Sequence, residues 1–301
     1  MRPKELAEAY TRGENITALL KGLSKTDCNT EDMIETAYDL QSGSYIRNLS
    51  DPEKYHHKLN YGRSIAEEVL SLTKPISILE AGVGEGTTFS FVLAGLNNPS
   101  LEAHGFDISW SRIASCRHWL QKNGHTKVFL SVASLLNLPY LDNSFDVVYT
   151  SHTIEPNGGN EKNILQELYR VTSQYLVLLE PGYELASDEA QRRMEQHGYC
   201  KGLVDSAESL GMRVLKHELF PHTANPLNPT AITVIVKDSA AHPAIPQLAC
   251  PQFGSPLIEN PDSLFSAESL RAYPKIKGIP CLRSQDGMIA SAYDQTAYNP
   301  D

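Results

Sequence analysis

Hydrophobic and polar residues between about positions 76 and 237 alternate between two kinds of segment. Short runs rich in Val, Ile, Leu and Phe are separated by stretches in which apolar residues recur every three or four positions. The first pattern is typical of strands and the second of helices that cover a sheet. This alternation predicts an α/β fold with a doubly wound, mostly parallel sheet. The seven predicted strands lie at or end near 76–79, 105–109, 127–132, 145–151, 175–182, 213–220 and 230–237.

The two flanks of this region differ from it. Residues 1–60 show helical and irregular patterns without strand signals, which predicts an N-terminal helical cap or lid. Residues 61–238 would form the main domain. Residues 239–301 begin with the proline-rich stretch DSAAHPAIPQ and continue into a small unit, which is too short to hold much core alone and is expected to pack on the main domain.

Composition narrows the classes of partner. Acidic residues outnumber basic ones, 36 against 26, and the resulting charge of −10 without a Lys/Arg cluster disfavours nucleic acid. No apolar run approaches the roughly 18 residues that span a bilayer, and the N-terminus lacks the apolar segment of a signal peptide, so we expect a cytoplasmic protein. Five scattered cysteines without a C-x-x-C pair predict reduced thiols and no disulfide framework: Cys28, Cys116, Cys200, Cys250 and Cys281.

The stretch ILEAGVGEG at 78–86 is the strongest candidate for ligand binding. A glycine turn between a strand and a helix suits a dinucleotide, a nucleoside triphosphate, S-adenosylmethionine or no ligand. Thr87 stands where the dinucleotide fingerprint needs its third glycine, and no Gly-Lys-Ser/Thr follows to make a P-loop. Glu80 and Glu85 flank the turn, and their charges would suit an ammonium group better than a pyrophosphate.

Five segments, ILEAGVGEG, GFDIS, SVASLLNLPYLDNSFDVVYTSHTIEP, ELYRV and YLVLLEPG, together resemble the class I S-adenosylmethionine-dependent methyltransferases. The resemblance implies a Rossmann-like sheet, S-adenosylmethionine as cofactor, and Asp107 as the ligand of the ribose hydroxyls. Many relatives have Asp in the adenine segment, where this chain has Ser134. The cofactor-binding residues implied are Glu80, Gly82, Gly84, Gly86, Asp107, Ile108, Ala133, Ser134, Leu135 and Ser151.

The acceptor of the methyl group would lie outside the carboxyl ends of the strands, beside SHTIEP at 151–156. His152 and Glu155 are the candidates for deprotonating or orienting it, although His152 could equally be a hydrogen-bonded residue at a strand end. Tyr38 and Tyr45 of the cap could close over the cofactor or serve in packing. Tyr183 is a weaker candidate for a residue beside the acceptor.

Residues 249–282, from ACPQF to GIPCL, resemble the small zinc-ribbon-like activator subunit of tRNA and protein methyltransferases. Structural zinc needs four ligands, but only Cys250 stands at a ligand-like position and Phe253 occupies that of its partner. Cys281 lies in an apolar stretch and is expected to be packed. The tail is therefore predicted to hold no metal and to serve in packing or in a homodimer.

The expected function is methyl transfer to a small-molecule acceptor such as a metabolite, a sugar or a natural-product intermediate, because the acidic composition disfavours polymeric anions. Two alternatives stay open. The kinship of the tail suggests methylation of a protein or tRNA. A catalytically silent chain that binds S-adenosylmethionine and acts as a scaffold would have the same sheet.

Overall fold

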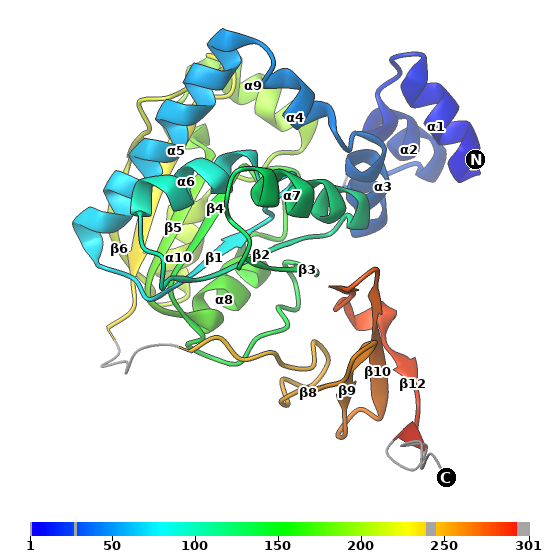
Figure 1. Cartoon of the computed structure of the whole chain (residues 1–301). Helices are drawn as coiled ribbons and strands as arrows, with labels where there is room; N and C mark the ends of the chain where they lie inside the picture. Colours follow the sequence, from blue (N-terminus) through cyan, green and yellow to red (C-terminus); the bar gives the residue numbers. More distant parts are fainter. Residues whose placement is uncertain (1, 27–28, 239–244, 294–301) are drawn as a thin grey trace.

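The computed structural model describes residues 2–26, 29–238 and 245–293, so Cys28 lies outside the described residues. A group of short helices, a central sheet covered by helices and a small antiparallel sheet follow one another along the chain (Figure 1). The four cysteines within the described ranges are buried and free of disulfides. Among the helices described, none is long and apolar enough to cross a membrane.

The central sheet has seven strands in the described residues, in the order β3-β2-β1-β4-β5-β7-β6. Strands β1 to β5 pair in parallel, and β7 runs antiparallel to both of its neighbours. This confirms the predicted fold class. The strands are β1 (Ser77–Ala81), β2 (Glu102–Asp107), β3 (Phe129–Val132), β4 (Phe145–Ser151), β5 (Thr172–Pro181), β6 (Arg213–Leu219) and β7 (Thr230–Val236).

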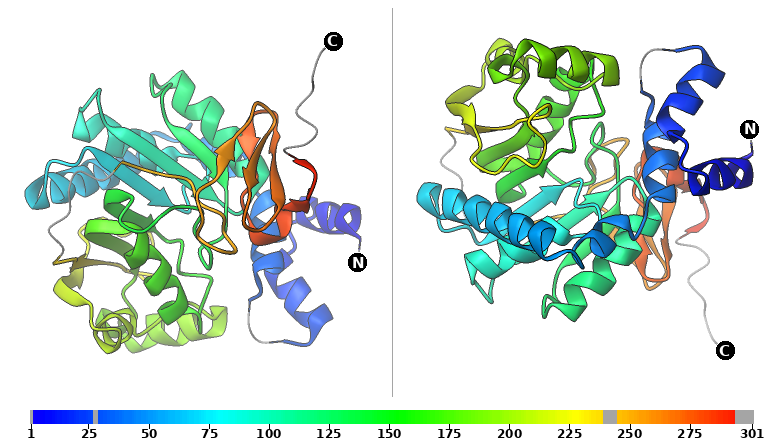
Figure 2. Two further views of the ribbon diagram at one scale, coloured as in Figure 1. Left: turned by 90° about the horizontal axis from the view of Figure 1, so that it is seen from below. Right: turned by 90° about the horizontal axis from the view of Figure 1, so that it is seen from above.

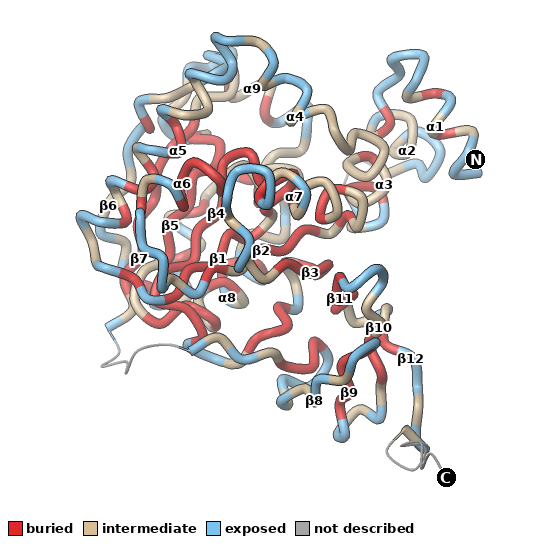
Figure 3. The backbone as a smooth tube through the Cα atoms, viewed as in Figure 1, coloured by how far each residue is buried: buried red, intermediate tan, exposed pale blue. Residues whose placement is uncertain are grey.

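Helices cover both faces of this sheet. Apolar residues of α5, α6 and α7 share one buried cluster with the sheet, and those of α8 and α10 share another. Apart from the edge strand β6, the strands between them are buried along most of their length (Figure 3), as expected where both faces are covered. The helices are α5 (Pro52–Leu72), α6 (Thr87–Leu96), α7 (Trp110–Lys122), α8 (Glu161–Val171), α9 (Asp188–His197) and α10 (Leu203–Ser209), with the 3₁₀ turn η1 (Tyr183–Leu185) before α9.

Beside β1 the strand order reverses, because β2 and β3 lie on one side and β4 and β5 on the other. In sheets of this kind, ligands bind outside the carboxyl ends of the strands at such a reversal. The chain leaves β1 into the glycine turn, leaves β2 at Asp107 and leaves β4 at Ser151. The three segments that carry the predicted site residues therefore meet at one edge.

The cap consists of α1 (Pro3–Thr11), α2 (Ile16–Ser24), α3 (Glu31–Leu40) and α4 (Ser44–Asn48). Its small core contains Leu6, Ala9 and Ile16, and it is fastened to the sheet by polar contacts. Glu85 accepts hydrogen bonds from the backbone N–H groups of Gly43 and Ile46, at 2.9 and 2.8 Å. The carboxylate of Glu85 thus fastens the cap at the start of α4, and its role beside an ammonium group stays a prediction.

The tail forms a five-stranded antiparallel appendage below the sheet edge (Figures 1 and 2). It meets β3 through a bridge between Cys281 and Val132, and it contacts the cap through an ion pair of Arg283 with Glu35 on α3. The tail therefore touches both the main sheet and the helix that covers the ligand edge. Its elements are β8 (Ile258–Glu259), β9 (Ser263–Ser266), β10 (Arg271–Ile276), β11 (Ile279–Pro280), η2 (Ser284–Asp286) and β12 (Met288–Ile289).

Candidate active site

The glycine turn after β1 adopts backbone conformations that disfavour other residues. Gly82, Gly84 and Gly86 have φ values of +73°, +55° and +71°, in the left-handed region where side chains cause strain. A Cβ on Gly82 would lie 2.0 Å from the Thr153 Cγ2, so no side chain fits there. A Cβ on Gly86 would instead lie 2.7 Å from the Cys116 Sγ. Gly86 therefore allows α6 to pack closely on α7 and does not line the cavity, so its prediction as a cofactor-binding residue is wrong.

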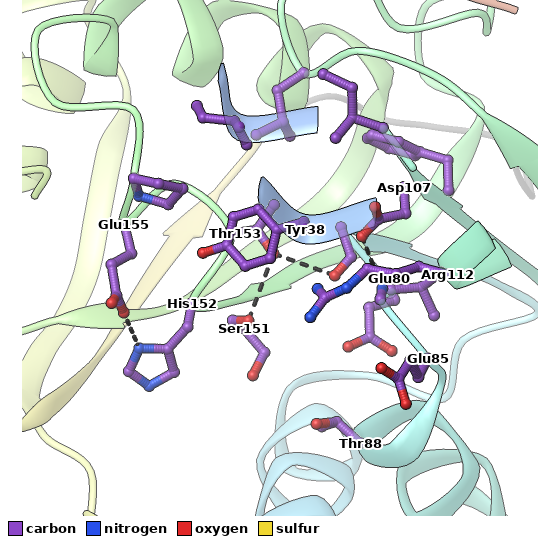
Figure 4. A pocket seen from close by; sticks show the side chains of 18 of the residues that line it. Tyr38, Glu80, Glu85, Thr88, Asp107, Arg112, Ser151, His152, Thr153 and Glu155 are labelled. Atoms are coloured by element: carbon purple, nitrogen blue, oxygen red, sulfur yellow. Dashed lines mark hydrogen bonds and ion pairs between the residues drawn. The ribbon is translucent and has the colours of Figure 1, made fainter. Parts of the chain in front are cut away.

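A cavity of about 320 Å³ opens above this turn and extends to His152 (Figure 4). Its walls come from the ends of β1, β2 and β4, from the loop after β3, and from α3, the α4 region and α5. Most of the residues predicted from the sequence meet here. Those lining it are Tyr38, Tyr45, Glu80, Gly82, Gly84, Asp107, Ile108, Ala133, Leu135, Ser151, His152 and Glu155.

Ser134 does not line the cavity, because its hydroxyl donates a hydrogen bond to the carboxylate of Glu31 on α3. Its oxygen also accepts the backbone N–H of Leu136, at 3.0 Å. Glu31 itself does line the cavity. A carboxylate therefore stands beside the predicted adenine segment after all, but the cap supplies it from 103 positions earlier in the chain. The absence of Asp at position 134 was the one sign in the sequence that a carboxylate from elsewhere could stand beside adenine.

Tyr183 also lies outside this cavity. The chain turns into η1 directly after β5, because the backbone N–H of Gly182 bonds to the Pro229 carbonyl at 2.8 Å and directs the next residues toward α9. The Tyr183 hydroxyl then donates to Glu195 Oε1 on α9, at 2.7 Å. Tyr183 therefore does not lie beside the acceptor, contrary to the prediction from the sequence.

Glu80 at the end of β1 is a buried acid with an unusual pKa. Its side chain is only 2% exposed, and burial raises its pKa to about 8, although the Tyr149 hydroxyl donates to its Oε2 at 2.8 Å. The charge of Lys58 on α5 acts against this rise in the pKa of Glu80, and the Lys58 Nζ donates to Thr88 Oγ1 at 3.1 Å. Burial lowers the pKa of Lys58. The carboxyl of Glu80 would be stabilised in its ionised form by a cationic ligand.

Asp107 at the end of β2 is held by two backbone groups. Its Oδ2 accepts the N–H of Gly84 at 3.0 Å, and its Oδ1 accepts the N–H of Ser109 at 2.9 Å. Burial nevertheless raises the pKa of Asp107 above its ordinary value. The carboxylate is thus fixed in orientation, while each of its oxygens keeps a lone pair for a hydroxyl donor in the cavity.

His152 follows β4 with a φ of +55°, a strained conformation for a residue with a side chain. Its Nδ1 lies 2.5 Å from Glu155 Oε2, and its Nε2 lies 2.8 Å from Thr230 Oγ1 on β7. Burial opposes the charged form, but the hydrogen bond to Glu155 and the charges of Glu155 and Glu180 outweigh it, so the pKa of His152 is raised. The carboxylate on Nδ1 leaves Nε2 as the nitrogen that can accept a proton.

Glu180 at the end of β5 fixes the turn that carries this pair. Its two oxygens accept the backbone N–H groups of Thr153 and Glu155, each at 3.0 Å. The Glu180 side chain is 1% exposed, and burial raises its pKa. The strained backbone of His152 is therefore held by the neighbouring strand, as is common at functional sites.

The cysteines of the tail do not gather into a metal site. Cys250 Sγ lies 3.6 Å from the Ser269 hydroxyl and 3.5 Å from that of Tyr273, and Phe253 is 61% exposed. Within the ranges that the structure describes, no group of three or more His, Cys, Asp or Glu side chains could hold an ion. That the tail binds no zinc stays a prediction, which elemental analysis of the purified protein would test.

The sheet order, the glycine turn at its reversal and the acidic residues ending β1 and β2 define a class I S-adenosylmethionine-dependent methyltransferase. Residues 72–218 match the sequence model of a family described as a methyltransferase domain. S-adenosylmethionine is the cofactor of the protein.

A solved methyltransferase structure has the same fold. Magnesium protoporphyrin IX methyltransferase from Synechocystis, determined with bound S-adenosylhomocysteine, matches with a TM-score of 0.53 and 12% identity over 69% of this chain and 100% of its own. An S-adenosylmethionine-dependent methyltransferase from Aquifex aeolicus is 18% identical, with a TM-score of 0.49 over 64% of this chain and 97% of its own.

Proposed function

We propose that the protein transfers the methyl group of S-adenosylmethionine to a small-molecule acceptor bound beside His152 and Glu155. The observation that carries this proposal is that one continuous cavity, of about 320 Å³, reaches from the glycine turn to the His152–Glu155 pair. Tyr38 and Tyr45 of the cap line it. A cavity of this size with a few convergent polar groups is typical of sites for small ligands.

The cavity residues fit the chemical groups of the cofactor. Glu80 offers a buried carboxyl to the ammonium group, and Asp107 offers fixed oxygens to the ribose hydroxyls. Ala133, Leu135 and Ile108 supply apolar contacts for adenine, and the Glu31 carboxylate can accept its amino group. Ser134 serves this site indirectly, by orienting Glu31. Gly82, Gly84 and Ser151 line the path between these groups.

When bound, S-adenosylmethionine supplies a methyl group activated by its sulfonium. The work left to the protein is to align the acceptor, exclude water and handle a proton. His152 Nε2 is the proton acceptor in this scheme, with Glu155 holding the opposite nitrogen and stabilising the imidazolium. Because Thr230 Oγ1 lies 2.8 Å from Nε2, an acceptor hydroxyl must displace the threonine hydroxyl or pass its proton through it.

The test is to incubate the purified protein with methyl-labelled S-adenosylmethionine and cell extract separated into metabolites, protein and RNA. We expect label in the metabolite fraction only, and less of it with Asp107→Ala, which should bind the cofactor more weakly. Label in the protein or RNA fraction would show that the acceptor is a macromolecule and not a small molecule. Cofactor binding without transfer to any fraction would favour a scaffold role.

A further inference from the structure

Arg112 on α7 points into the middle of the cavity, close to Tyr38 (Figure 4). The residue is only 7% exposed, and its guanidinium carbon lies 4.5 Å from the ring centre of Tyr38 and 4.6 Å from that of Tyr45. Two aromatic faces of the cap therefore enclose a cation of the main domain. A Cβ on Gly84 would lie 3.4 Å from Arg112 Nη1, so the guanidinium also lies against the glycine turn.

Two nitrogens of this buried guanidinium have no hydrogen-bond partner. Nε and Nη2 are both inaccessible and unpaired, and none of the described carboxylates forms an ion pair with Arg112 within 4.0 Å. The N–H groups of Nε and Nη2 point the same way along one edge of the guanidinium plane. Leaving two such donors buried without acceptors is costly, since a charged group is involved. The edge is therefore built to receive a ligand.

The shape of this edge selects the ligand group. Two parallel N–H donors match the two oxygens of a carboxylate, in the bidentate geometry for which arginine is suited. Asp107 and Glu85 accept hydrogen bonds from backbone N–H groups and form no ion pair with Arg112. A bound carboxylate would supply the acceptors that Nε and Nη2 lack.

We propose that the Nε–Nη2 edge of Arg112 binds the carboxylate of the methionine part of S-adenosylmethionine. This inference rests on the cofactor site proposed above, in which Asp107 and Glu80 take the hydroxyl and ammonium groups. The carboxylate is the one anionic group of the cofactor, and it is attached to the same carbon as the ammonium group proposed to bind Glu80. The guanidinium lies against the glycine turn that follows Glu80. Because Tyr38 and Tyr45 hold the guanidinium, recognition of the carboxylate depends on the cap being in place.

The test compares two ligands that differ only in this carboxylate: S-adenosylhomocysteine and its decarboxylated analogue, S-adenosyl-3-thiopropylamine. Calorimetry would measure both affinities for the wild type, Arg112→Met, Arg112→Lys and the control Arg63→Met, which removes an exposed arginine on α5. Arg112→Met should weaken S-adenosylhomocysteine about tenfold or more and leave the analogue unchanged. Arg112→Lys keeps the charge without the paired donors and should fall between, while Arg63→Met should match the wild type.

Other outcomes would overturn the inference. An equal loss for both ligands would mean that Arg112 only shapes the cavity. Unchanged affinity for S-adenosylhomocysteine would assign the arginine edge to an acceptor. Thermal unfolding without ligand would show whether Arg112→Met folds. If it does not, Arg112→Lys is the deciding variant: a lower ratio of S-adenosylhomocysteine affinity to analogue affinity than in the wild type would support the proposal, and an unchanged ratio would overturn it. A wild-type protein that binds neither ligand would overturn the cofactor site as well.

Discussion

The cavity has two walls of different construction. The sheet wall consists of side chains at the ends of β1, β2 and β4, which are held by groups of the main domain, as Asp107 is by the N–H groups of Gly84 and Ser109. The cap wall consists of α3 and the α4 region, which join the sheet wall through side chains far apart in sequence, such as Glu31 with Ser134. The geometry of the sheet wall follows from the fold, whereas that of the cap wall depends on a few polar contacts.

This difference suggests that the two walls have different functions. The sheet wall should carry the reacting groups and the main cofactor contacts, since such groups must be held closely in place. The cap adds specificity and excludes water, and it can open because its own buried core is small. Variants of the sheet wall should therefore have larger effects than variants of the cap wall.

The largest effect is expected at His152. If Nε2 accepts the proton of a hydroxyl acceptor, His152→Ala should lower turnover about 10²–10⁴-fold and leave S-adenosylhomocysteine affinity nearly unchanged. Because a base must be neutral to act and the pKa of His152 is raised in the free protein, wild-type kcat/KM should rise with pH through a midpoint above the ordinary value of 6.5. Initial rates with labelled cofactor and the acceptor fraction measure both.

The control for this experiment is His217→Ala, because His217 Nδ1 lies 2.8 Å from Thr233 Oγ1 in a second His–Thr pair that reaches β7 outside the cavity. It should leave turnover and the pH profile as in the wild type. If His152→Ala retains full turnover, the imidazole only supports the strand end, and alignment alone accounts for catalysis.

A smaller loss is expected at Asp107. Asp107→Ala should weaken S-adenosylhomocysteine by about 1–3 kcal/mol, because the variant removes the acceptor of the ribose hydroxyls. Calorimetry measures this loss, and Asp142→Ala, which removes an exposed carboxylate paired with Arg170, is the control. Undiminished affinity would show that the ribose lies elsewhere.

The pH dependence of cofactor binding tests Glu80. Its pKa of about 8 means that the carboxyl is mostly protonated at pH 7 in the free protein. An ammonium group favours the ionised form, so binding should release a proton, and affinity should rise by up to about tenfold per pH unit until about pH 8. Calorimetry in buffers of different ionisation enthalpy would detect the release. Glu80→Gln should remove this dependence, and proton uptake on binding would contradict the role.

The sequence predicted the sheet wall better than the cap wall for a physical reason. The glycine turn, Asp107 and Ser151 stand next to strands whose apolar patterns are local, so their meeting at one edge follows from the fold class. Glu31 reaches the cavity through the packing of α3 on the main domain, which no local pattern encodes. Arg112 follows β2 at the start of α7, but its enclosure by Tyr38 and Tyr45 depends on the cap. Gly86 and Ser134 were misassigned because their motif positions do not reveal which way they face.

The smallest expected effect comes from the cap wall, at Glu31. Its carboxylate should accept the amino group of adenine, so wild-type protein should prefer S-adenosylhomocysteine to S-inosylhomocysteine, whose base carries a carbonyl there. Glu31→Gln keeps a partner for Ser134 and offers an amide donor to the carbonyl, so the preference should fall about fivefold, or about 1 kcal/mol. The control is Glu35→Gln on the same helix, since Glu35 pairs with Arg283 of the tail and does not line the cavity. An unchanged preference would place adenine away from the cap, and a loss as large as that of Asp107→Ala would show that the cap wall is as essential to cofactor binding as the sheet wall.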